Sequence, residues 1–340
     1  MKAIGYQTAH PIDHPESLLD ITLPEPTATG RDLLVEVLAV SVNPVDTKVR
    51  KSSARSGDGP DYKVLGWDAA GIVKAVGPDV TWFKPGDRVW YAGSIARPGT
   101  NSELHLVDER IVGHAPQSLS HAQAAALPLT AITAWEMLFD RLGIAPGKQP
   151  SHKTLLIIGA SGGVGSIMTQ LAARLTSLTV IGTASRPETQ AWVKELGAHH
   201  VIDHSQPLAA ELKRIGFDTV DYIVSLTQTN QHLPQIVEAI APQGKFGLID
   251  DPVKFDATLF KRKSVSIHWE LMFTRALYGT DDMPGQHRLL NEVAALVDAG
   301  LLRSTMAEHL GTINAANLKK AHTLIESGKA RGKVVLEGWN

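Results

Sequence analysis

Residues 154–175 read TLLIIGASGGVGSIMTQLAARL, which is an apolar run, a glycine-rich turn and an amphipathic run in direct succession. Small residues let the backbone of such a turn approach a pyrophosphate closely, and the N–H groups at the start of the following helix stabilise its charge. The string is incomplete, because Ala160 stands at the first position of the GxGxxG pattern. The alternative is a tight turn without a ligand. The surrounding pattern favours a dinucleotide site, with candidate residues Ser161, Gly162, Gly163 and Val164.

Strands and helices alternate on the C-terminal side of this turn. We predict helices at 163–175, 187–197, 207–216 and 233–240, and strands at 178–183, 199–203, 220–225, 244–250 and 264–270. This order predicts a doubly wound parallel sheet. Before about residue 115, short apolar runs separated by Pro and Gly predict an all-β region with long loops. After residue 284 we predict two helices and two short strands, and the last strand is expected to return to the first domain.

Composition excludes several classes of protein. The 340 residues are 43% hydrophobic and 20% charged, with a formal net charge of −2, so neither a disordered tail nor a nucleic-acid-binding surface is indicated. The chain has no cysteine, which excludes disulfides and thiolate metal sites. No stretch approaches the roughly 20 apolar residues that span a bilayer. We therefore expect a soluble cytoplasmic protein with no membrane partner.

The residues after the second predicted strand indicate which dinucleotide binds. An Asp or Glu at this place holds the ribose 2′-hydroxyl of NAD, but here the chain carries Ser185 and Arg186. A guanidinium binds the 2′-phosphate of NADP through charge-assisted hydrogen bonds, so NADPH is the predicted cofactor. The alternative is a solvated Arg at a helix start, with Glu188 close enough to keep NAD open.

Several motifs together resemble the medium-chain dehydrogenase/reductase superfamily, in particular its zinc-free quinone oxidoreductase branch and the proteins named zinc-type alcohol dehydrogenase-like. They are SVNPVDTKVR, LGWDAAGIVKAVG, KPGDRVW, AAALPLTAITAWEML, GASGGVG and ESGKARGKVVL. The resemblance covers nearly the whole chain. It implies an α/β protein in which residues 1–126 and 285–340 form a GroES-like β-rich catalytic domain and residues 127–284 form a Rossmann dinucleotide-binding domain. It also places His204 near the adenosine phosphate, and Lys329 is a further candidate for phosphate recognition.

The resemblance implies that catalytic zinc is absent. The three positions that bind zinc in the alcohol dehydrogenases fall on Asn43, Trp67 and Leu129, none of which is a zinc ligand here. The segment AGSIARPGTNSEL, which corresponds to the structural zinc lobe, has no cysteine. Among the 14 histidines, HPIDH and the group at residues 199–204 stand out, but no third ligand is apparent from the sequence, so no metal site is predicted.

The absence of zinc indicates the type of substrate. Zinc enzymes stabilise the alkoxide of a simple alcohol by Lewis-acid chemistry, whereas quinones and α,β-unsaturated carbonyls spread the charge that arrives with hydride. We therefore predict an NADPH-dependent reductase of small quinones or enones. An enoyl thioester reductase and a non-catalytic NADPH-binding protein of the same fold are the alternatives.

The resemblance also implies which residues line the substrate site. Asn43 is predicted as a donor to the substrate oxygen, or alternatively as a turn former before Pro44. Asp46 is expected to have a structural role. Trp67 and Tyr91 are predicted as an apolar wall or as core residues. Thr133 completes the predicted catalytic set, with Trp269 and Phe273 as further candidates. No proton donor stands out, since Tyr62 lies at the far end of its segment.

The strand SVSIHWE is expected at the edge of the parallel sheet. The unpaired backbone groups of an edge strand invite pairing with a second copy, so a homodimer is predicted.

Overall fold

The computed structural model describes residues 1–52 and 62–339, and its chain divides into two compact units. Unit 1 contains residues 1–132 and 273–340, and unit 2 contains residues 133–272. The predicted borders at 127 and 284 differ from these. The first observed border falls inside a helix, α3 (Pro128–Trp135), and the second places a short helix, α8 (Thr274–Tyr278), in unit 1.

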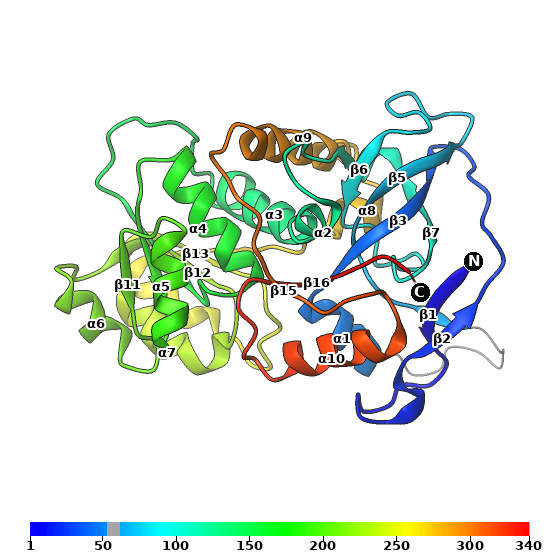
Figure 1. The fold of residues 1–340 in the computed structure, drawn as a ribbon. Coiled ribbons are helices and arrows are strands. Elements are labelled where there is room, and N and C mark those ends of the chain that lie inside the picture. Colours follow the sequence, from blue (N-terminus) through cyan, green and yellow to red (C-terminus); the bar gives the residue numbers. More distant parts are fainter. Residues whose placement is uncertain (53–61, 340) are drawn as a thin grey trace. The chain divides into compact units, whose positions relative to one another are not determined.

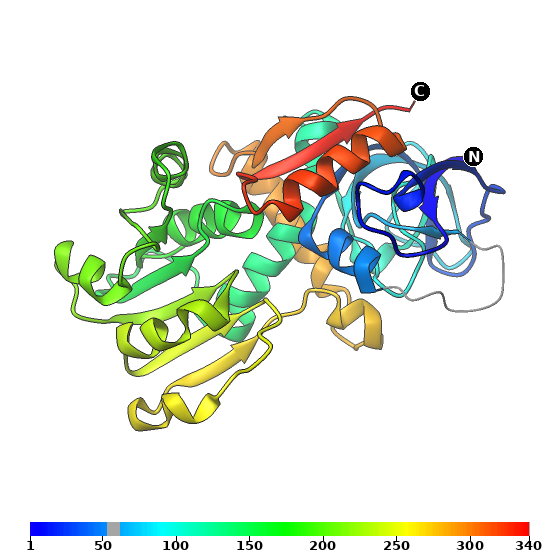
Figure 2. The same cartoon turned by 90° about the horizontal axis from the view of Figure 1, so that it is seen from below.

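Unit 2 is built on a six-stranded parallel sheet. Its strands have the order β11-β10-β9-β12-β13-β14, which is the strand order typical of Rossmann folds. The strands are β9 (Thr154–Ile158), β10 (Thr179–Thr183), β11 (His200–Ile202), β12 (Val220–Ser225), β13 (Ile240–Leu248) and β14 (Ser266–Trp269). The helical elements are α4 (Gly163–Leu175), α5 (Pro187–Glu195), α6 (Leu208–Arg214), α7 (Thr229–Ala239), the 3-10 helix η4 (Ala257–Lys263) and the π-helical turn η3 (Glu136–Arg141). Figure 2 shows this sheet and its helices in green and yellow.

Sequence periodicity places most of these elements correctly, and α4 has the predicted bounds. Helix α7 begins four residues earlier than Leu233, the predicted start. The backbone N–H of Thr229 donates to Asp250 Oδ2 at 2.8 Å, so a carboxylate from the end of another strand caps the helix there. A cap of this kind leaves no signal in the local sequence.

Unit 1 joins the two ends of the sequence in one sheet. Strand β16 (Lys333–Glu337) pairs antiparallel with β3 (Asp32–Val42), and Figure 1 shows the red C-terminal strand beside the blue one. The main sheet follows the order β15-β16-β3-β5-β6-β8, with β7 paired to β3. Its other strands are β5 (Asp68–Val76), β6 (Arg88–Tyr91), β7 (Leu104–Asp108), β8 (Val112–His114) and β15 (Met306–His309).

A second, three-stranded sheet completes the β structure described for unit 1. It contains β1 (Lys2–Tyr6), β2 (Leu19–Thr22) and β4 (Lys63–Val64). The helices of the unit are α1 (Pro44–Ser52), α2 (His121–Ala125), the first part of α3, α8, α9 (Gly285–Asp298) and α10 (Ala315–Glu326), with 3-10 turns η1 (Pro15–Ser17) and η2 (Glu109–Ile111). No helix among the described residues is long and apolar enough to cross a membrane.

Helix α1 is the main difference from the predicted all-β region. Pro44 occupies its first position, where the missing N–H is not needed, and the Asp46 side chain accepts the backbone N–H of Asn43 at 2.8 Å. The sequence NPVD therefore encodes the N-terminus of a helix. A prediction that considers only apolar runs does not detect it.

Candidate functional site

The glycine turn of unit 2 lies between β9 and α4. Gly159 has a φ of +84°, a conformation that favours glycine. A Cβ at Gly165 would lie 2.4 Å from the Gly159 carbonyl oxygen, so only glycine allows the helix to start this close to the strand. Residues 161–164 are partly exposed, and the N-cap residue of α4 is Gly162, which has no side chain to cap the helix. The first backbone N–H groups of α4 therefore remain suitable for a pyrophosphate.

The end of β10 carries no acidic residue. Thr183 ends the strand, Ser185 is exposed, and the partly exposed Arg186 has its Nε 3.3 Å from Glu188 Oε1. Glu188 thus holds the guanidinium at the surface, where the ion pair is weak and can exchange for a phosphate. Ser185 and the Arg186 guanidinium thus both lie at the surface at this strand end.

His204 lies beside the same strand end. Its Nδ1 is 3.1 Å from Thr183 Oγ1, and that hydroxyl also accepts the backbone N–H of Gly159 at 3.1 Å. Burial lowers the pKa of His204. A neutral ring offers a hydrogen bond to a cofactor, but no full positive charge. Lys329, the remaining predicted phosphate residue, is exposed and belongs to unit 1.

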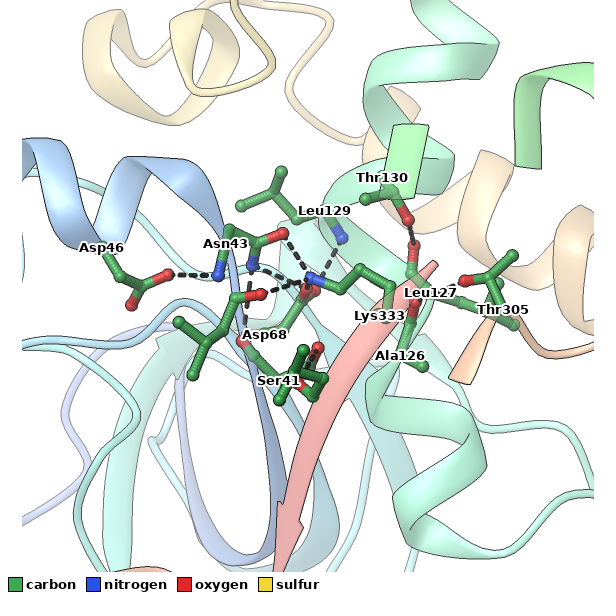
Figure 3. Close-up of polar contacts among 12 residues, drawn as sticks. Ser41, Asn43, Asp46, Asp68, Ala126, Leu127, Leu129, Thr130, Thr305 and Lys333 are labelled. Atoms are coloured by element: carbon green, nitrogen blue, oxygen red, sulfur yellow. Dashed lines mark hydrogen bonds and ion pairs between the residues drawn. The ribbon is translucent and has the colours of Figure 1, made fainter. Parts of the chain in front are cut away.

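A buried polar network in unit 1 surrounds Asn43. Lys333 reaches from β16 between Asn43 and Asp68, as Figure 3 shows. Its Nζ lies 3.0 Å from Asp68 Oδ2 and 3.1 Å from the Val42 carbonyl oxygen, and it also donates to Asn43 Oδ1. The Lys333 and Asp68 side chains are 3% and 0% exposed, so this is a fully buried ion pair.

Charge fixes the orientation of the Asn43 amide. Lys333 can only donate and ionised Asp68 can only accept, so Oδ1 faces Lys333 and Nδ2 donates to Asp68 Oδ2 at 2.8 Å. The second Nδ2 hydrogen points to the Ser41 carbonyl oxygen at 3.4 Å. With both amide hydrogens directed at the protein, Asn43 is not placed as a free donor to a substrate oxygen. Its amide instead links Lys333, Asp68 and the Ser41 carbonyl oxygen.

Asp68 also holds the start of α3. Its Oδ1 accepts the backbone N–H of Leu129 at 2.7 Å, next to the first residue of that helix. A carboxylate at a helix N-terminus stabilises the exposed N–H groups there. Sequence reasoning missed both Asp68 and Lys333. The available signal was a single charged residue at the start of each of two apolar strands, DAAGIV and KVVL.

Asp46 lies next to this network and has the expected structural role. It accepts the Asn43 N–H through Oδ2, while Oδ1 is buried without a partner among the described residues. Burial raises the pKa of the Asp46 carboxyl to about 7, although the Asn43 hydrogen bond and the Lys333 charge both lower it. The carboxyl is therefore partly protonated near neutral pH.

The two residues predicted to form an aromatic wall, Trp67 and Tyr91, have different partners in the structure. Tyr91 is fully buried, and its hydroxyl contacts His105 Nδ1 at 3.1 Å, so it is a core residue. Trp67 is buried, donates from Nε1 to the Ser94 carbonyl oxygen at 3.2 Å and meets Phe273 edge-on with ring centroids 5.9 Å apart. Trp67 and Phe273 are thus brought together, and Tyr91 does not join them.

Three further candidates occupy other places. Thr133 is buried and begins unit 2, on α3. Trp269 is 54% exposed at the end of β14, which is an edge strand as predicted. Tyr62 is exposed beside Gly5 of β1, and residues 53–61 of its segment lie outside the described residues.

An ion pair anchors the loop AGSIARPGTNSEL. Arg97 makes two contacts to the Asp32 carboxylate, at 2.7 and 3.0 Å. His105 Nε2 lies 3.0 Å from the Pro98 carbonyl oxygen, so this nitrogen carries the hydrogen and Nδ1 accepts from Tyr91. These contacts fix a loop that has no cysteine with which to bind a structural metal.

Comparisons with known proteins cover the whole chain. Residues 29–126 match the alcohol dehydrogenase GroES-like domain family, and residues 196–336 match the zinc-binding dehydrogenase family. A zinc-type alcohol dehydrogenase-like protein from Staphylococcus epidermidis is 38% identical over 99% of both chains. A solved structure from Rhizobium etli CFN 42, named as a zinc-dependent alcohol dehydrogenase, has a TM-score of 0.96 and 61% identity, covering 100% of this chain and 98% of that one. The quinone oxidoreductase of Pseudomonas syringae has a TM-score of 0.82 and 26% identity over 99% of both chains.

Proposed function

Because the chain belongs to the medium-chain dehydrogenase/reductase superfamily, among the zinc-type alcohol dehydrogenase-like proteins, we propose that it transfers hydride from NADPH to quinones or α,β-unsaturated carbonyls without zinc. The superfamily consists of oxidoreductases that use a nicotinamide cofactor. The proposal concerns the identity of the acceptor, the preference for NADPH and the absence of a catalytic metal.

The buried Asn43–Asp68–Lys333 network is the observation that carries this proposal. By resemblance, the zinc positions fall on Asn43, Trp67 and Leu129. Here the amide of Asn43 is bound to protein groups, and the other two side chains are apolar. Within the part of the chain that the structure describes, one cluster of His, Asp and Glu side chains has the spacing of a metal site, and it lies elsewhere, at His10, His14 and Glu16. The word zinc in the relatives' names therefore does not describe the residues of this site.

A reaction at such a site suits acceptors that stabilise their own charge. Bound NADPH supplies hydride, and the conjugated acceptor delocalises the charge that arrives with it. Removing the hydroxyl proton of a simple alcohol has no comparable support without a Lewis acid. Water is the proposed source of the proton that completes reduction.

The residues of this chain then have three roles. The backbone N–H groups of residues 161–164, in the glycine turn and the first residues of α4, hold the pyrophosphate. Ser185 and Arg186 hold the 2′-phosphate, with His204 and Lys329 as further candidates. Trp67 and Phe273 are both 2% exposed and pack against each other, so they are proposed as the support behind a substrate pocket rather than as its surface. Asn43 positions the backbone around the network rather than contacting the substrate. Thr133 remains a proposed pocket residue.

A panel of acceptors tests the proposal. Initial rates are measured with NADPH and with NADH against an ortho-quinone, a para-quinone, a small enone, a crotonyl thioester of coenzyme A and, in the reverse direction, ethanol. We expect the quinones or the enone to be reduced fastest, with NADPH preferred. Dominant thioester reduction would favour an enoyl thioester reductase. Tight NADPH binding without turnover would favour a non-catalytic binding protein.

We further propose a homodimer formed through β14. This strand is an edge of the parallel sheet, and its backbone groups pair on one side with β13. Exposed Trp269 and Leu271, with 54% and 53% of their surfaces accessible, add apolar area at the strand end. A cytoplasmic location remains a prediction from the sequence.

A further inference from the structure

The loop between β1 and β2 carries two histidines and a glutamate at close range. His10, His14 and Glu16 each offer one ligand atom, and these atoms all lie within 4.8 Å of one another. The two imidazole rings are stacked, with centroids 3.9 Å apart and an interplanar angle of 16°. Imidazole nitrogen and carboxylate oxygen together are a donor set that suits Zn²⁺ and its neighbours among the transition metals.

The backbone of this loop is fixed from several sides. The carbonyl oxygen of His10 accepts from Arg50, a fully buried side chain that also pairs with Glu326. The Ile12 carbonyl oxygen accepts from Ser17 Oγ at 2.9 Å, and His14 and Ser17 make turn hydrogen bonds of 3.0 and 3.1 Å. A fixed backbone reduces the entropy lost when side chains are ordered around an ion.

The side chains themselves remain accessible. His10 and His14 are half-buried and Glu16 is exposed, so an ion can reach them from solvent. Ligand bonds of about 2.0–2.2 Å place the donor atoms of a tetrahedral ion closer together than 4.8 Å. An imidazole lone pair lies in the plane of its ring, so two stacked rings at 16° to each other cannot both point at one ion. Metal binding therefore requires at least one of the two half-buried rings to rotate out of the stack, while the exposed Glu16 side chain moves toward them.

From these observations we propose that His10, His14 and Glu16 form a binding site for a divalent transition-metal ion such as Zn²⁺. The site belongs to unit 1, uses none of the residues at the positions that correspond to catalytic zinc, and departs from the sequence-based expectation of no metal. Three protein ligands leave a position for water, so the ion exchanges readily. The site is independent of the proposed oxidoreductase function.

One existing hydrogen bond limits the affinity. The Glu16 backbone N–H donates to His14 Nδ1 at 3.2 Å, so Nδ1 has no hydrogen and Nε2 carries it in the neutral ring. When Nε2 binds a metal, the ring proton moves to Nδ1 and this cap at the start of η1 is lost. Replacement of His14 must therefore separate the loss of a ligand from the loss of a cap.

The experiment is a calorimetric titration of the full-length, chelator-treated protein with zinc chloride in a non-coordinating buffer. We expect about one equivalent to bind. His10→Ala should weaken binding by more than about tenfold, because even the loss of a group that only hydrogen-bonds a metal ligand lowers metal affinity 10–100-fold. His14→Asn should weaken it equally, because the Asn side chain still caps Glu16 N–H but provides no imidazole. His152→Ala, which alters an exposed histidine outside the loop, should bind as the wild type does.

Two results would overturn the proposal. One is no heat of binding in the wild type, and the other is binding that survives both His10→Ala and His14→Asn or that is lost in His152→Ala. Thermal unfolding without zinc should match between the wild type and His14→Asn, which shows that the cap is retained. NADPH-dependent reduction rates are expected to be the same with and without zinc, so failure of this site leaves the proposed function untouched.

Discussion

Replacing Lys333 with Met should destabilise unit 1 strongly. The substitution keeps an unbranched side chain but removes the ammonium, and it leaves the carboxylate of Asp68, which is 0% exposed, without its charged partner. Removing one partner of a buried ion pair typically costs about 3–5 kcal/mol, because a buried charge is left uncompensated. The hydrogen bonds to Val42 and Asn43 are lost as well.

The assay is urea unfolding followed by circular dichroism, supported by thermal melts. Because Asp68 retains the hydrogen bonds from Asn43 and Leu129, the lower end of that range is expected, about 3 kcal/mol. For a unit of this size, each kcal/mol lowers Tm by roughly 2–4 °C. The double variant Lys333→Met with Asp68→Asn should be more stable than the single Lys333 variant, since neither charge then remains buried alone.

Lys74 provides the matched control. Its ion pair with Glu36 has a distance of 3.2 Å, but the two side chains are 51% and 43% exposed. Lys74→Met should cost less than about 1 kcal/mol, because water and salt screen the pair. A loss below about 1 kcal/mol for Lys333→Met, or strictly additive effects in the double variant, would refute the reasoning about the network.

Three other predictions concern the cofactor, pH and assembly. In fluorescence titrations, Arg186→Ala should weaken NADPH binding by roughly 1.5–3 kcal/mol and leave NADH affinity nearly unchanged, because only NADPH carries the 2′-phosphate. Equal losses of affinity for both cofactors would show that other residues recognise the phosphate. The pKa of Asp46 is about 7 in the folded protein and 3.8 in the unfolded chain. Between these pH values the folded protein holds a proton that the unfolded chain has released. The free energy of unfolding should therefore fall as pH rises from about 4 to about 7, by at most ~4 kcal/mol. Asp46→Asn should flatten that slope in urea unfolding, and an unchanged slope would contradict the assignment. Light scattering at micromolar concentration should give the mass of a dimer, and Trp269→Lys should shift it toward the monomer, whereas a wild-type monomer would count against pairing through β14.

The parts of the fold that follow local patterns could be predicted from the sequence. The apolar run of β9 and the close glycine packing of the next turn fix α4 at Gly163–Leu175, because both depend on neighbouring residues. Helix α1 shows how local evidence is missed, since NPVD encodes its start but follows a long apolar strand. The first turn of α7 depends on Asp250, which is distant in sequence, so periodicity places its start too late.

In the candidate site too, the sequence predicts local features but not contacts between distant residues. Ser185 and Arg186 follow directly from their place after β10, because a strand end and its next residues are local features. The partnership of Asp68 and Lys333 joins residues 265 positions apart, and their contact arises when β3 pairs with both β5 and β16. Asn43 was singled out by resemblance, but its hydrogen-bond partners could not be known before that pairing. Because both amide hydrogens of Asn43 face protein acceptors, we propose a positioning role for it in place of the predicted donor role.

We propose that hydride transfer by this protein requires a conjugated acceptor and no metal. The most direct test measures the initial rate of NADPH-dependent quinone or enone reduction, and of NADP-dependent ethanol oxidation, on protein treated with a chelator and checked for metal content by mass spectrometry. We expect a reduction rate equal to that of untreated protein, together with ethanol oxidation that is negligible beside it. Loss of reduction on removal of about one zinc per chain, or ethanol oxidation by the metal-free protein as fast as its best quinone or enone, would contradict it.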